Sequence, residues 1–261
     1  MRSKLGTSVL VPIEEAPGDN PVVVDRFREW QLEAISEFGF GVLFIGDTVP
    51  DFDADTTHGH IRFHQWIGDS WCMLFSHPKS FTPVCTTELG YVTRLKPEFE
   101  KRNCKIMGLS VDSIADHLAW GRDIADVMGQ APNFPIIGDP HLKIARLFGM
   151  LQARGETTAQ ERTAEDNLTV RTVHIIGPDK TIKAMLTYPM SNGRNFHEML
   201  RLLDAIQLTT RHDVVTPAQW EPGQDVIIAP RISKAEAQAK YPQGWIEPKP
   251  YMRFVAHPLE D

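Results

Sequence analysis

Three cysteines, Cys72, Cys85 and Cys104, are the strongest candidate nucleophiles of the sequence. A cysteine acts as a nucleophile only as its thiolate. Cys72 falls inside a continuous apolar run and Cys104 stands just before another, so both are expected to be buried and inert. Cys85 instead falls in the first turn of an expected helix, with Pro83 as a suitable first helical residue. The unpaired backbone N–H groups and the helix dipole favour an anion there, which predicts a reactive thiol at Cys85.

The spacing of the three cysteines argues against other common uses of this residue. The stretches between them are 12 and 18 residues long, and no CxxC pair occurs. This pattern is too scattered for a disulfide framework and does not fit a zinc site. A thioredoxin-type disulfide oxidoreductase would need a second cysteine at position 88, which is a glutamate. The sequence also shows no sign of a flavin, haem or nicotinamide site, so we expect no cofactor and no bound metal.

The residues that lead to Cys85 form a specific motif. Residues 78–85 read P-K-S-F-T-P-V-C and are followed at once by T-T-E. They fit the pattern P-x-x-x-T-x-x-C, and with this motif the sequence resembles the peroxiredoxin family, within it the 1-Cys branch. The likeness runs from about Gly46 to the C-terminus and includes GDTVPDF, FPII, GMLQ, IIGPDK and TPAQWEPGQDVIIAP. Residues 1–45 fall outside the usual family pattern.

The resemblance implies a thiol peroxidase that reduces hydrogen peroxide and organic hydroperoxides as part of antioxidant defence. In such an enzyme the thiolate of Cys85 attacks one peroxide oxygen and becomes a sulfenic acid. The resemblance also implies that Thr82 hydrogen-bonds the peroxide, that Pro78 shields the pocket from water, and that Arg171 supports the thiolate and the developing charge. No cysteine follows Cys104. The thiol that resolves the sulfenic acid is therefore expected to come from outside the chain.

The resemblance places a second group of residues, His77, Glu88 and Arg194, around the same pocket. Glu88 lies three residues after Cys85, so both are near one face of the expected helix. A carboxylate at that position disfavours a neighbouring thiolate, and we therefore expect Glu88 to pair with an arginine. The alternation of residues around Arg171 does not by itself show that this side chain faces the site.

The elements expected to position these residues alternate between strands and helices. A continuous apolar run at 71–76 predicts a buried strand. The helix from Pro83 carries Leu89, Val92, Leu95 and Phe99 on its apolar face, with Glu88 elsewhere. Further expected elements are a strand at 105–111, a helix capped by Ser113 with Ile114, Leu118, Ile124 and Val127 on one face, a strand in FPIIGDP, a short helix ended by Gly149, a hairpin of 170–176 and 182–188, and a helix at 195–206. This order predicts an α/β fold with a central mixed sheet, and it resembles a thioredoxin-like fold.

Three regions follow from composition and pattern. Residues 1–45 form an N-terminal extension, in which 25–38 has the spacing of a short amphipathic helix. Residues 46–209 form the thioredoxin-like peroxidase domain. Residues 210–261 are rich in proline and contain Trp220 and Trp245, which are too apolar for a disordered tail. We expect this last region to be a small appended module, packed on the body or on a partner subunit.

The charge and hydropathy of the chain restrict its partners. Lys and Arg number 27 against 34 Asp and Glu, which gives a net charge of −7 and does not favour nucleic acid or an anionic membrane. No apolar run approaches the length of a membrane span, and the N-terminus lacks the features of a signal peptide. We expect a cytoplasmic protein without stable membrane association. The resemblance implies a homodimer or a higher homo-oligomer.

Two other functions stay open from the sequence. Some animal 1-Cys peroxiredoxins have a phospholipase activity assigned to a GDSWG serine, a histidine and an aspartate, which correspond here to Ser70, His64 and Asp179. The residue after Trp71 is Cys72 rather than glycine, so this pattern is imperfect. A Ser-His-Asp site is recognised by its geometry rather than by its order in the chain. A chaperone role is also known in the family, and the sequence does not assess it.

Overall fold

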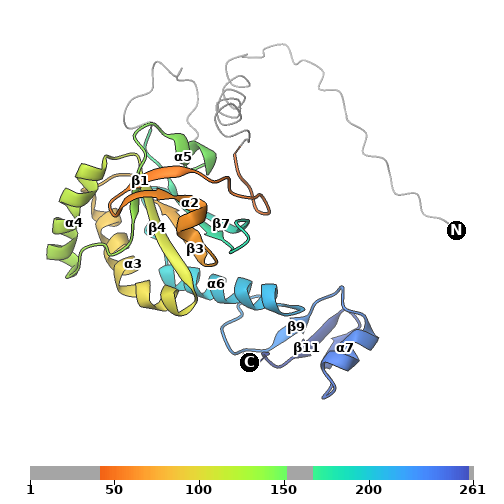
Figure 1. Cartoon of the computed structure of the whole chain (residues 1–261). Coiled ribbons are helices and arrows are strands. Elements are labelled where there is room, and N and C mark those ends of the chain that lie inside the picture. Colours follow the sequence, from red (N-terminus) through yellow and green to blue (C-terminus); the bar gives the residue numbers. More distant parts are fainter. Residues whose placement is uncertain (1–41, 152–166, 259–261) are drawn as a thin grey trace, which may run out of the picture.

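The protein consists of an α/β body and a smaller C-terminal module. The computed structural model describes residues 42–151 and 167–258, and the helix expected at 25–38 lies outside them. In Figure 1 the module lies beyond the end of helix α6 (Phe196–Arg211), away from the central sheet of the body. The expected thioredoxin-like α/β fold with a central mixed sheet and an appended module is confirmed.

The central sheet has seven strands in the order β2-β1-β5-β4-β3-β6-β7. Their bounds are β1 Asp53–Thr56, β2 Gly59–Arg62, β3 Trp71–Ser76, β4 Cys104–Ser110, β5 Ile136–Gly138, β6 Arg171–Ile176 and β7 Ile182–Tyr188. Strands β3, β4 and β5 pair in parallel, and the remaining pairs are antiparallel. The carboxyl ends of the parallel strands therefore meet at one edge, where the loop after β3 leads to Cys85.

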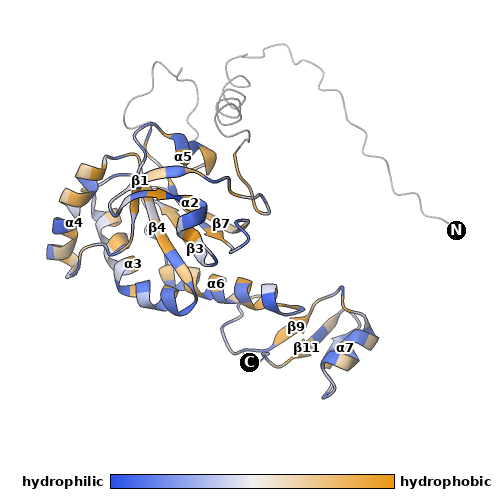
Figure 2. Cartoon of the chain, in the orientation of Figure 1, coloured by the Kyte–Doolittle hydropathy of each residue, from blue (hydrophilic) through white to orange (hydrophobic). Residues whose placement is uncertain are grey.

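Helices cover both faces of this sheet. They are α2 Phe63–Ile67, α3 Pro83–Lys101, α4 Ile114–Met128 and α5 Lys143–Leu147, together with α6. Met73 and Phe75 of β3 pack in one core with α3, α4 and α6, whereas Cys72 and Leu74 pack on the other face with α2 and α5. Figure 2 shows the consequence: the inner strands are mostly hydrophobic, and α3 and α6 carry both hydrophilic and hydrophobic residues. Among the described helices, none is long and apolar enough to cross a bilayer.

Helices α3 and α4 pack closely together. Gly90 of α3 lies against α4, and a Cβ at this position would stand 2.5 Å from Cγ of Met128. Only a glycine allows this approach without a shift of one helix. The contact fixes α3, which carries Cys85 in its first turn, against α4.

The buried face of α4 differs from the expected one. Ser113 caps the helix as predicted, since its side chain accepts a hydrogen bond from the backbone N–H of Asp116. Leu118 and Val127 are 55 % and 70 % exposed, however, so their place on the expected apolar face was wrong, whereas Ile124 is buried as expected. The face that packs on the core carries His117, Trp120 and Ile124. Trp120 brings more apolar area than Leu118, and this decides the rotation of the helix.

The C-terminal module has a core of its own. Its four-stranded sheet has the order β10-β11-β9-β8. The elements are β8 Val214–Val215, β9 Val226–Ile228, α7 Lys234–Lys240, β10 Ile246–Lys249 and β11 Met252–Val255. Trp220 lies at the centre of this core, which also includes Ala205 and Leu208 of α6. Because α6 continues to Arg211, one helix belongs both to the body and to the module.

His174 makes the stability of the body depend on pH. The side chain lies on β6 against the ring of Phe148, and among the described residues neither of its ring nitrogens has a hydrogen-bond partner. Burial lowers the pKa of His174 to about 4, against about 6.5 in an unfolded chain. Between these values the unfolded chain binds a proton that the folded protein does not. Stability is therefore unaffected above the window and falls as the pH falls through it.

We expect His174 alone to lower the free energy of unfolding by roughly 3 kcal/mol between pH 7.5 and pH 4. Denaturant unfolding of the wild type, His174→Phe and His174→Gln at several pH values tests this. Both variants should lose most of this fall in the free energy of unfolding with pH. Only His174→Phe is expected to be as stable as the wild type at pH 7.5. Some slope should remain, because burial also lowers the pKa of His77 and of His117. An unchanged slope in both variants would assign the acid sensitivity elsewhere.

Candidate active site

The loop between β3 and α3 is held by backbone and side-chain hydrogen bonds on both sides. The N–H of His77 donates to the carbonyl of Leu109 at 2.9 Å, and the hydroxyl of Thr169 donates to the carbonyl of His77 at 2.7 Å. Further along, the N–H of Ser80 donates to Oδ2 of Asp112 at 2.5 Å. The loop therefore has a fixed path, and it delivers the chain to the first turn of α3 in a defined position.

Cys85 lies in the first turn of α3, as predicted, and is fully buried. Its Sγ accepts a hydrogen bond at 3.3 Å from one terminal nitrogen (NH1) of the Arg171 guanidinium. The register of the sheet explains the contact. Phe75 of β3 pairs with Val173 of antiparallel β6, so Arg171 lies level with the residue after the end of β3 and on the same sheet face as Val173. The sequence did not show on which face of the sheet the Arg171 side chain lies, and the structure places it on the face that packs against α3.

Glu88 is the centre of a buried ion-pair group, although the sequence pattern placed it off the apolar face of the helix. Its Oε2 accepts hydrogen bonds at 2.7 Å from Arg171 and from Arg194. Its Oε1 accepts from the backbone N–H and from Nε of Arg194, at 2.8 Å and 2.9 Å. The prediction that Glu88 lies off the apolar face was wrong, because a residue one helical turn after Cys85 still faces the core. The expected pairing with an arginine is present twice.

Backbone carbonyls complete the anchoring of the two arginines. The carbonyl of Met190 accepts from Nε and NH2 of Arg171 at 2.9 Å and 2.7 Å, and the carbonyl of Thr172 accepts from Arg194 at 2.8 Å. Arg171 is thereby held on two sides with one N–H directed at Sγ of Cys85. The sequence did not point to Met190, because a backbone acceptor leaves no mark in the residue type. Its closeness to Arg194 in the chain was the available signal.

The charges of this group favour an anion at Cys85. Two buried guanidinium groups face one buried carboxylate, which among the described residues of this group leaves one positive charge without a counter-charge. Burial lowers the pKa of Arg194, and the Glu88 carboxylate opposes that shift. An uncompensated charge in a buried site is costly, and a thiolate at Cys85 supplies the missing negative charge.

The other expected site residues lie in the loop. Pro78 is buried, and Thr82 is the partly exposed residue before the first turn of α3. The hydroxyl of Thr82 donates to the carbonyl of Lys79 at 2.8 Å, so its oxygen keeps lone pairs for a donor. His77 is buried against the rings of His117 and Trp120, and it has no hydrogen bond to the arginine group in the described structure. The structure thus brings Cys85, Glu88, Arg171 and Arg194 into direct contact, with Thr82 beside them in the chain and His77 behind the loop.

Comparison with known proteins assigns this arrangement to a family. The AhpC/TSA family matches residues 45–185, and the C-terminal domain of 1-Cys peroxiredoxin matches residues 205–244. The chain is 47 % identical over 216 residues to a 1-Cys peroxiredoxin of Dictyostelium discoideum, which covers 83 % of this chain and 86 % of that protein. It is 45 % identical to peroxiredoxin-6 of Rattus norvegicus, over 84 % of this chain and 99 % of the other.

The chain belongs to the AhpC/TSA family and, within it, to the 1-Cys peroxiredoxins. Solved structures agree. Peroxiredoxin 6 of Arenicola marina matches with a TM-score of 0.75 and 41 % identity over 84 % of this chain and all of that one. A yeast mitochondrial 1-Cys peroxiredoxin gives a TM-score of 0.76 and 47 % identity over 82 % of this chain and all of that one. A 2-Cys peroxiredoxin of Plasmodium vivax is less similar, with a TM-score of 0.62 and 26 % identity over 70 % of this chain and 92 % of that one. This peroxiredoxin is a thiol peroxidase, as the sequence indicated.

The other two cysteines of this peroxiredoxin are unsuited to nucleophilic attack. Burial raises the pKa of Cys72 well above its ordinary value and the pKa of Cys104 to about 12. Cys72 lies in the core on the opposite face of the sheet from Cys85. The prediction that both are buried is confirmed.

The residues considered for a hydrolase do not form a triad in this peroxiredoxin. The hydroxyl of Ser70 donates to Oδ1 of Asn103, and Nε2 of His64 bonds the carbonyl of Val49. Asp179 accepts from Thr181 and pairs with Lys183. Ser70, His64 and Asp179 all lie in the described part of the chain, and no hydrogen bond joins any two of them. The geometry therefore does not favour a hydrolase.

Proposed function

We propose that Cys85 is the peroxidatic cysteine and that Arg171, Thr82 and Pro78 act with it on the peroxide. The observation that carries this proposal is the single guanidinium nitrogen of Arg171 that bonds both Sγ of Cys85 and Oε2 of Glu88. A donor held in this way needs no reorganisation when charge develops on the reacting oxygens. Arg194 and Glu88 position Arg171, and His77 and Pro78 close the inner side of the pocket.

The proposed reaction is displacement at oxygen. The Cys85 thiolate attacks the nearer oxygen of a hydroperoxide, the O–O bond breaks, and the leaving alkoxide or hydroxide takes a proton to become an alcohol or water. Cys85 leaves this step as a sulfenic acid. One external thiol then displaces water to give a mixed disulfide, and a second thiol releases the reduced Cys85 and carries away the disulfide.

The fold supports resolution by an external thiol. From Cys85 to Lys101, helix α3 extends about 24 Å at ~1.5 Å per residue. Cys104 follows the end of this helix, and it pairs with Trp71 at the amino end of β3, next to Cys72. Both cysteines therefore lie at the edge of the sheet opposite Cys85. A disulfide needs Cα atoms within roughly 7 Å, so neither can reach Cys85 in the folded chain.

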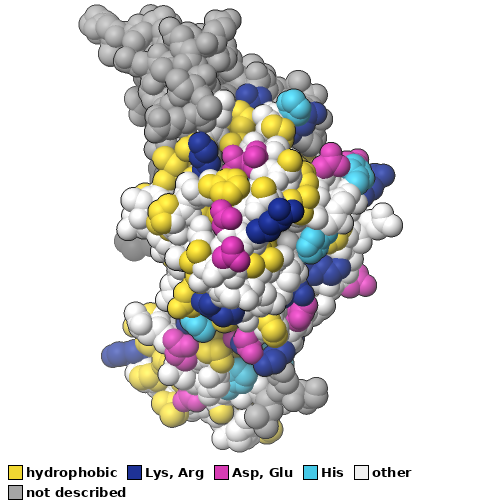
Figure 3. Space-filling model, turned by 90° about the vertical axis from the view of Figure 1, so that its left-hand side faces the viewer, with side chains coloured by type: hydrophobic (Ala, Val, Ile, Leu, Met, Phe, Trp, Pro, Cys, Tyr) yellow, Lys and Arg dark blue, Asp and Glu magenta, His cyan; other side chains and the backbone are white. Residues whose placement is uncertain are grey.

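The reductant that we propose is a thiol of the glutathione or thioredoxin class. In the similar yeast mitochondrial 1-Cys peroxiredoxin, the thiol is resolved via glutathione/thioredoxin systems. Figure 3, viewed from the side of α4, shows acidic and basic side chains interspersed on this face, which suits a soluble partner rather than a nucleic acid. A cytoplasmic location and a homodimer or higher homo-oligomer stay predictions. Peroxide consumption measured separately with glutathione and with a thioredoxin system tests the reductant.

We expect a single equivalent of peroxide to leave a sulfenic acid on Cys85 and no protein disulfide. The measurement is the intact mass of the reduced protein after peroxide, with dimedone present to trap the sulfenic acid. One adduct should form, and peptide mapping should place it on Cys85. Cys85→Ser is the matched control and should remain unlabelled. A rapidly formed disulfide between Cys85 and another cysteine, within or between subunits, that supports turnover would make this a 2-Cys enzyme.

A further inference from the structure

Behind the loop between β3 and α3 lies a cluster of three side chains, His77, Asp112 and His117, of which only His77 also borders the proposed peroxide pocket. One ligand-type atom from each lies within 4.8 Å of the others. His77 follows β3, Asp112 stands in the turn after β4, and His117 is on α4. Because His77 precedes the other two by 35 positions or more in the chain, sequence spacing did not indicate a site here. We refer to these residues as the His–Asp cluster.

His77 is the feature of the cluster that calls for a ligand. The side chain is completely buried, and in the described structure neither ring nitrogen has a hydrogen-bond partner. A buried polar group without a partner is costly and uncommon in a folded protein. A neutral imidazole is the form that ligates metals.

The surroundings of the other two members suit ligands of a metal. Oδ2 of Asp112 accepts from the N–H of Ser80 at 2.5 Å and from the hydroxyl of Ser110 at 3.2 Å. The ring nitrogens of His117 contact the hydroxyls of Ser80 and Ser110 at the longer distances of 3.1 Å and 3.3 Å. Hydroxyl groups rotate. One serine hydroxyl can therefore keep its hydrogen bond to one ring nitrogen of His117 while the other ring nitrogen of His117 binds an ion. Such outer contacts orient metal ligands in proteins.

Charge balance permits a cation at this place. In the register of the sheet Arg171 lies level with His77, and Arg194 bonds the carbonyl of Thr172 next to it. Their two positive charges are matched by the carboxylate of Glu88 and, in the reactive enzyme, by the thiolate of Cys85. The carboxylate of Asp112 then remains to neutralise part of the charge of an ion in the His–Asp cluster.

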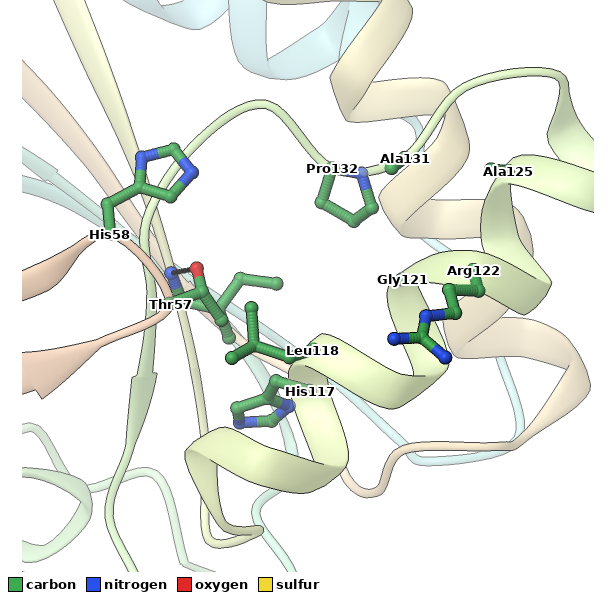
Figure 4. Close-up of a pocket in the computed structure, with 10 residues that line it drawn as sticks. Thr57, His58, His117, Leu118, Gly121, Arg122, Ala125, Ala131 and Pro132 are labelled. Atoms are coloured by element: carbon green, nitrogen blue, oxygen red, sulfur yellow. Dashed lines mark hydrogen bonds between the residues drawn. The ribbon is translucent and has the colours of Figure 1, made fainter.

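A pocket borders the cluster at His117. A pocket of about 320 Å³ lies between α4, the turn at Thr57 and His58, and the segment at Ala131 and Pro132, and His117 forms part of its wall. Figure 4 shows the ring of His117 at one end of this pocket, beside Leu118. The pocket therefore lies directly beside the buried side chain of His117, one of the candidate ligands.

We propose that His77, Asp112 and His117 bind a divalent transition-metal ion of the zinc type, with water as a further ligand. Two imidazoles and a carboxylate are ligands that zinc and its first-row neighbours accept. Zinc lies about 2.0–2.2 Å from such atoms, so the cluster contracts by roughly 1 Å on binding. The ion would join the residue before Pro78 to α4 and to the turn after β4. It would thus brace the loop that carries the motif, while the peroxidase chemistry of Cys85 stands without it.

The test is titration of the full-length, tag-free protein with Zn²⁺ by calorimetry and with Co²⁺ by visible absorption. The titration uses the reduced wild type, which keeps the thiolate that balances the second arginine, and the Cys85→Ser variant, because the Cys85 thiolate is itself a possible metal ligand. We expect one ion per chain and Co²⁺ bands without the intense absorption of a thiolate ligand. In the Cys85→Ser background His117→Gln and Asp112→Asn should each weaken binding tenfold or more. His117→Gln retains polar groups toward Ser80 and Ser110, and thermal unfolding without metal verifies that it is folded.

A matched control separates the His–Asp cluster from a surface site. His60 contacts Asp55 and Asp53 on the exposed β1–β2 hairpin, and such a group also attracts metal ions. His60→Ala should leave the stoichiometric site unchanged. Binding that His60→Ala removes and His117→Gln retains would overturn the proposal, and so would the absence of stoichiometric binding. Neither result touches the peroxidase assignment, which rests on Cys85 and Arg171.

Discussion

Replacement of Cys85 by serine is expected to abolish peroxide consumption and to leave the protein folded. A serine hydroxyl stays protonated at neutral pH and is a far weaker nucleophile than a thiolate. The serine oxygen can still accept a hydrogen bond from Arg171, so the buried Arg171–Glu88–Arg194 group keeps its partners. Peroxide consumption with an excess of external thiol measures the activity, and circular dichroism with thermal unfolding measures the fold. Consumption at the wild-type rate would refute the role of Cys85.

The other two cysteines provide the controls for that experiment. Cys72→Ala and Cys104→Ala remove buried thiols that pack in the core and that burial keeps protonated. Each variant is expected to be less stable than the wild type because it leaves a small cavity. Each should nevertheless keep most of the peroxidase activity. A loss of activity in a folded Cys104→Ala variant would point to a second essential cysteine.

The parts of the site that the sequence predicts are those set by local pattern. The apolar run at 71–76 is strand β3 with the same bounds, and helix α3 begins at Pro83 as expected. Cys85 could be singled out because a helix start, a preceding loop and the motif agree at one position. These features depend on neighbours in the chain, and the structure changes none of them.

The parts that the sequence did not predict depend on tertiary contacts. Glu88 was expected beside the pocket and paired with an arginine, but its place off the hydrophobic stripe of the helix did not indicate that it is buried. It is buried because β6 and the turn before α6 bring Arg171 and Arg194 to it. On α4, Trp120 and His117 were not counted as part of the apolar face, so the predicted buried face of the helix was turned away from the observed one. The carbonyl of Met190 has no side-chain signature at all. In each case the missing information was a partner from a distant segment.

Arg171 is the most informative residue to change after Cys85, because it reaches the site from a distant segment of the chain. Arg171→Ala is expected to lower the second-order rate of reduced enzyme with peroxide by ~10²–10³-fold, the usual cost of removing one charge-stabilising donor. The variant also leaves Glu88 with one arginine rather than two. Stopped-flow measurement of the intrinsic tryptophan fluorescence reports the reaction, because Trp120 donates to Thr86 in the first turns of α3.

Two further variants separate charge from geometry. Arg171→Lys keeps the positive charge, but one ammonium group cannot reproduce the planar fork that bonds Cys85, Glu88 and the Met190 carbonyl together. We expect its rate to lie between those of Arg171→Ala and the wild type. Arg201→Ala removes an arginine that pairs with Glu198 on α6 and should leave the rate unchanged. A change of less than about threefold in Arg171→Ala, well below the usual cost of such a donor, would mean that Arg194 stabilises the transition state. In that case Arg171 would only hold Glu88 in place.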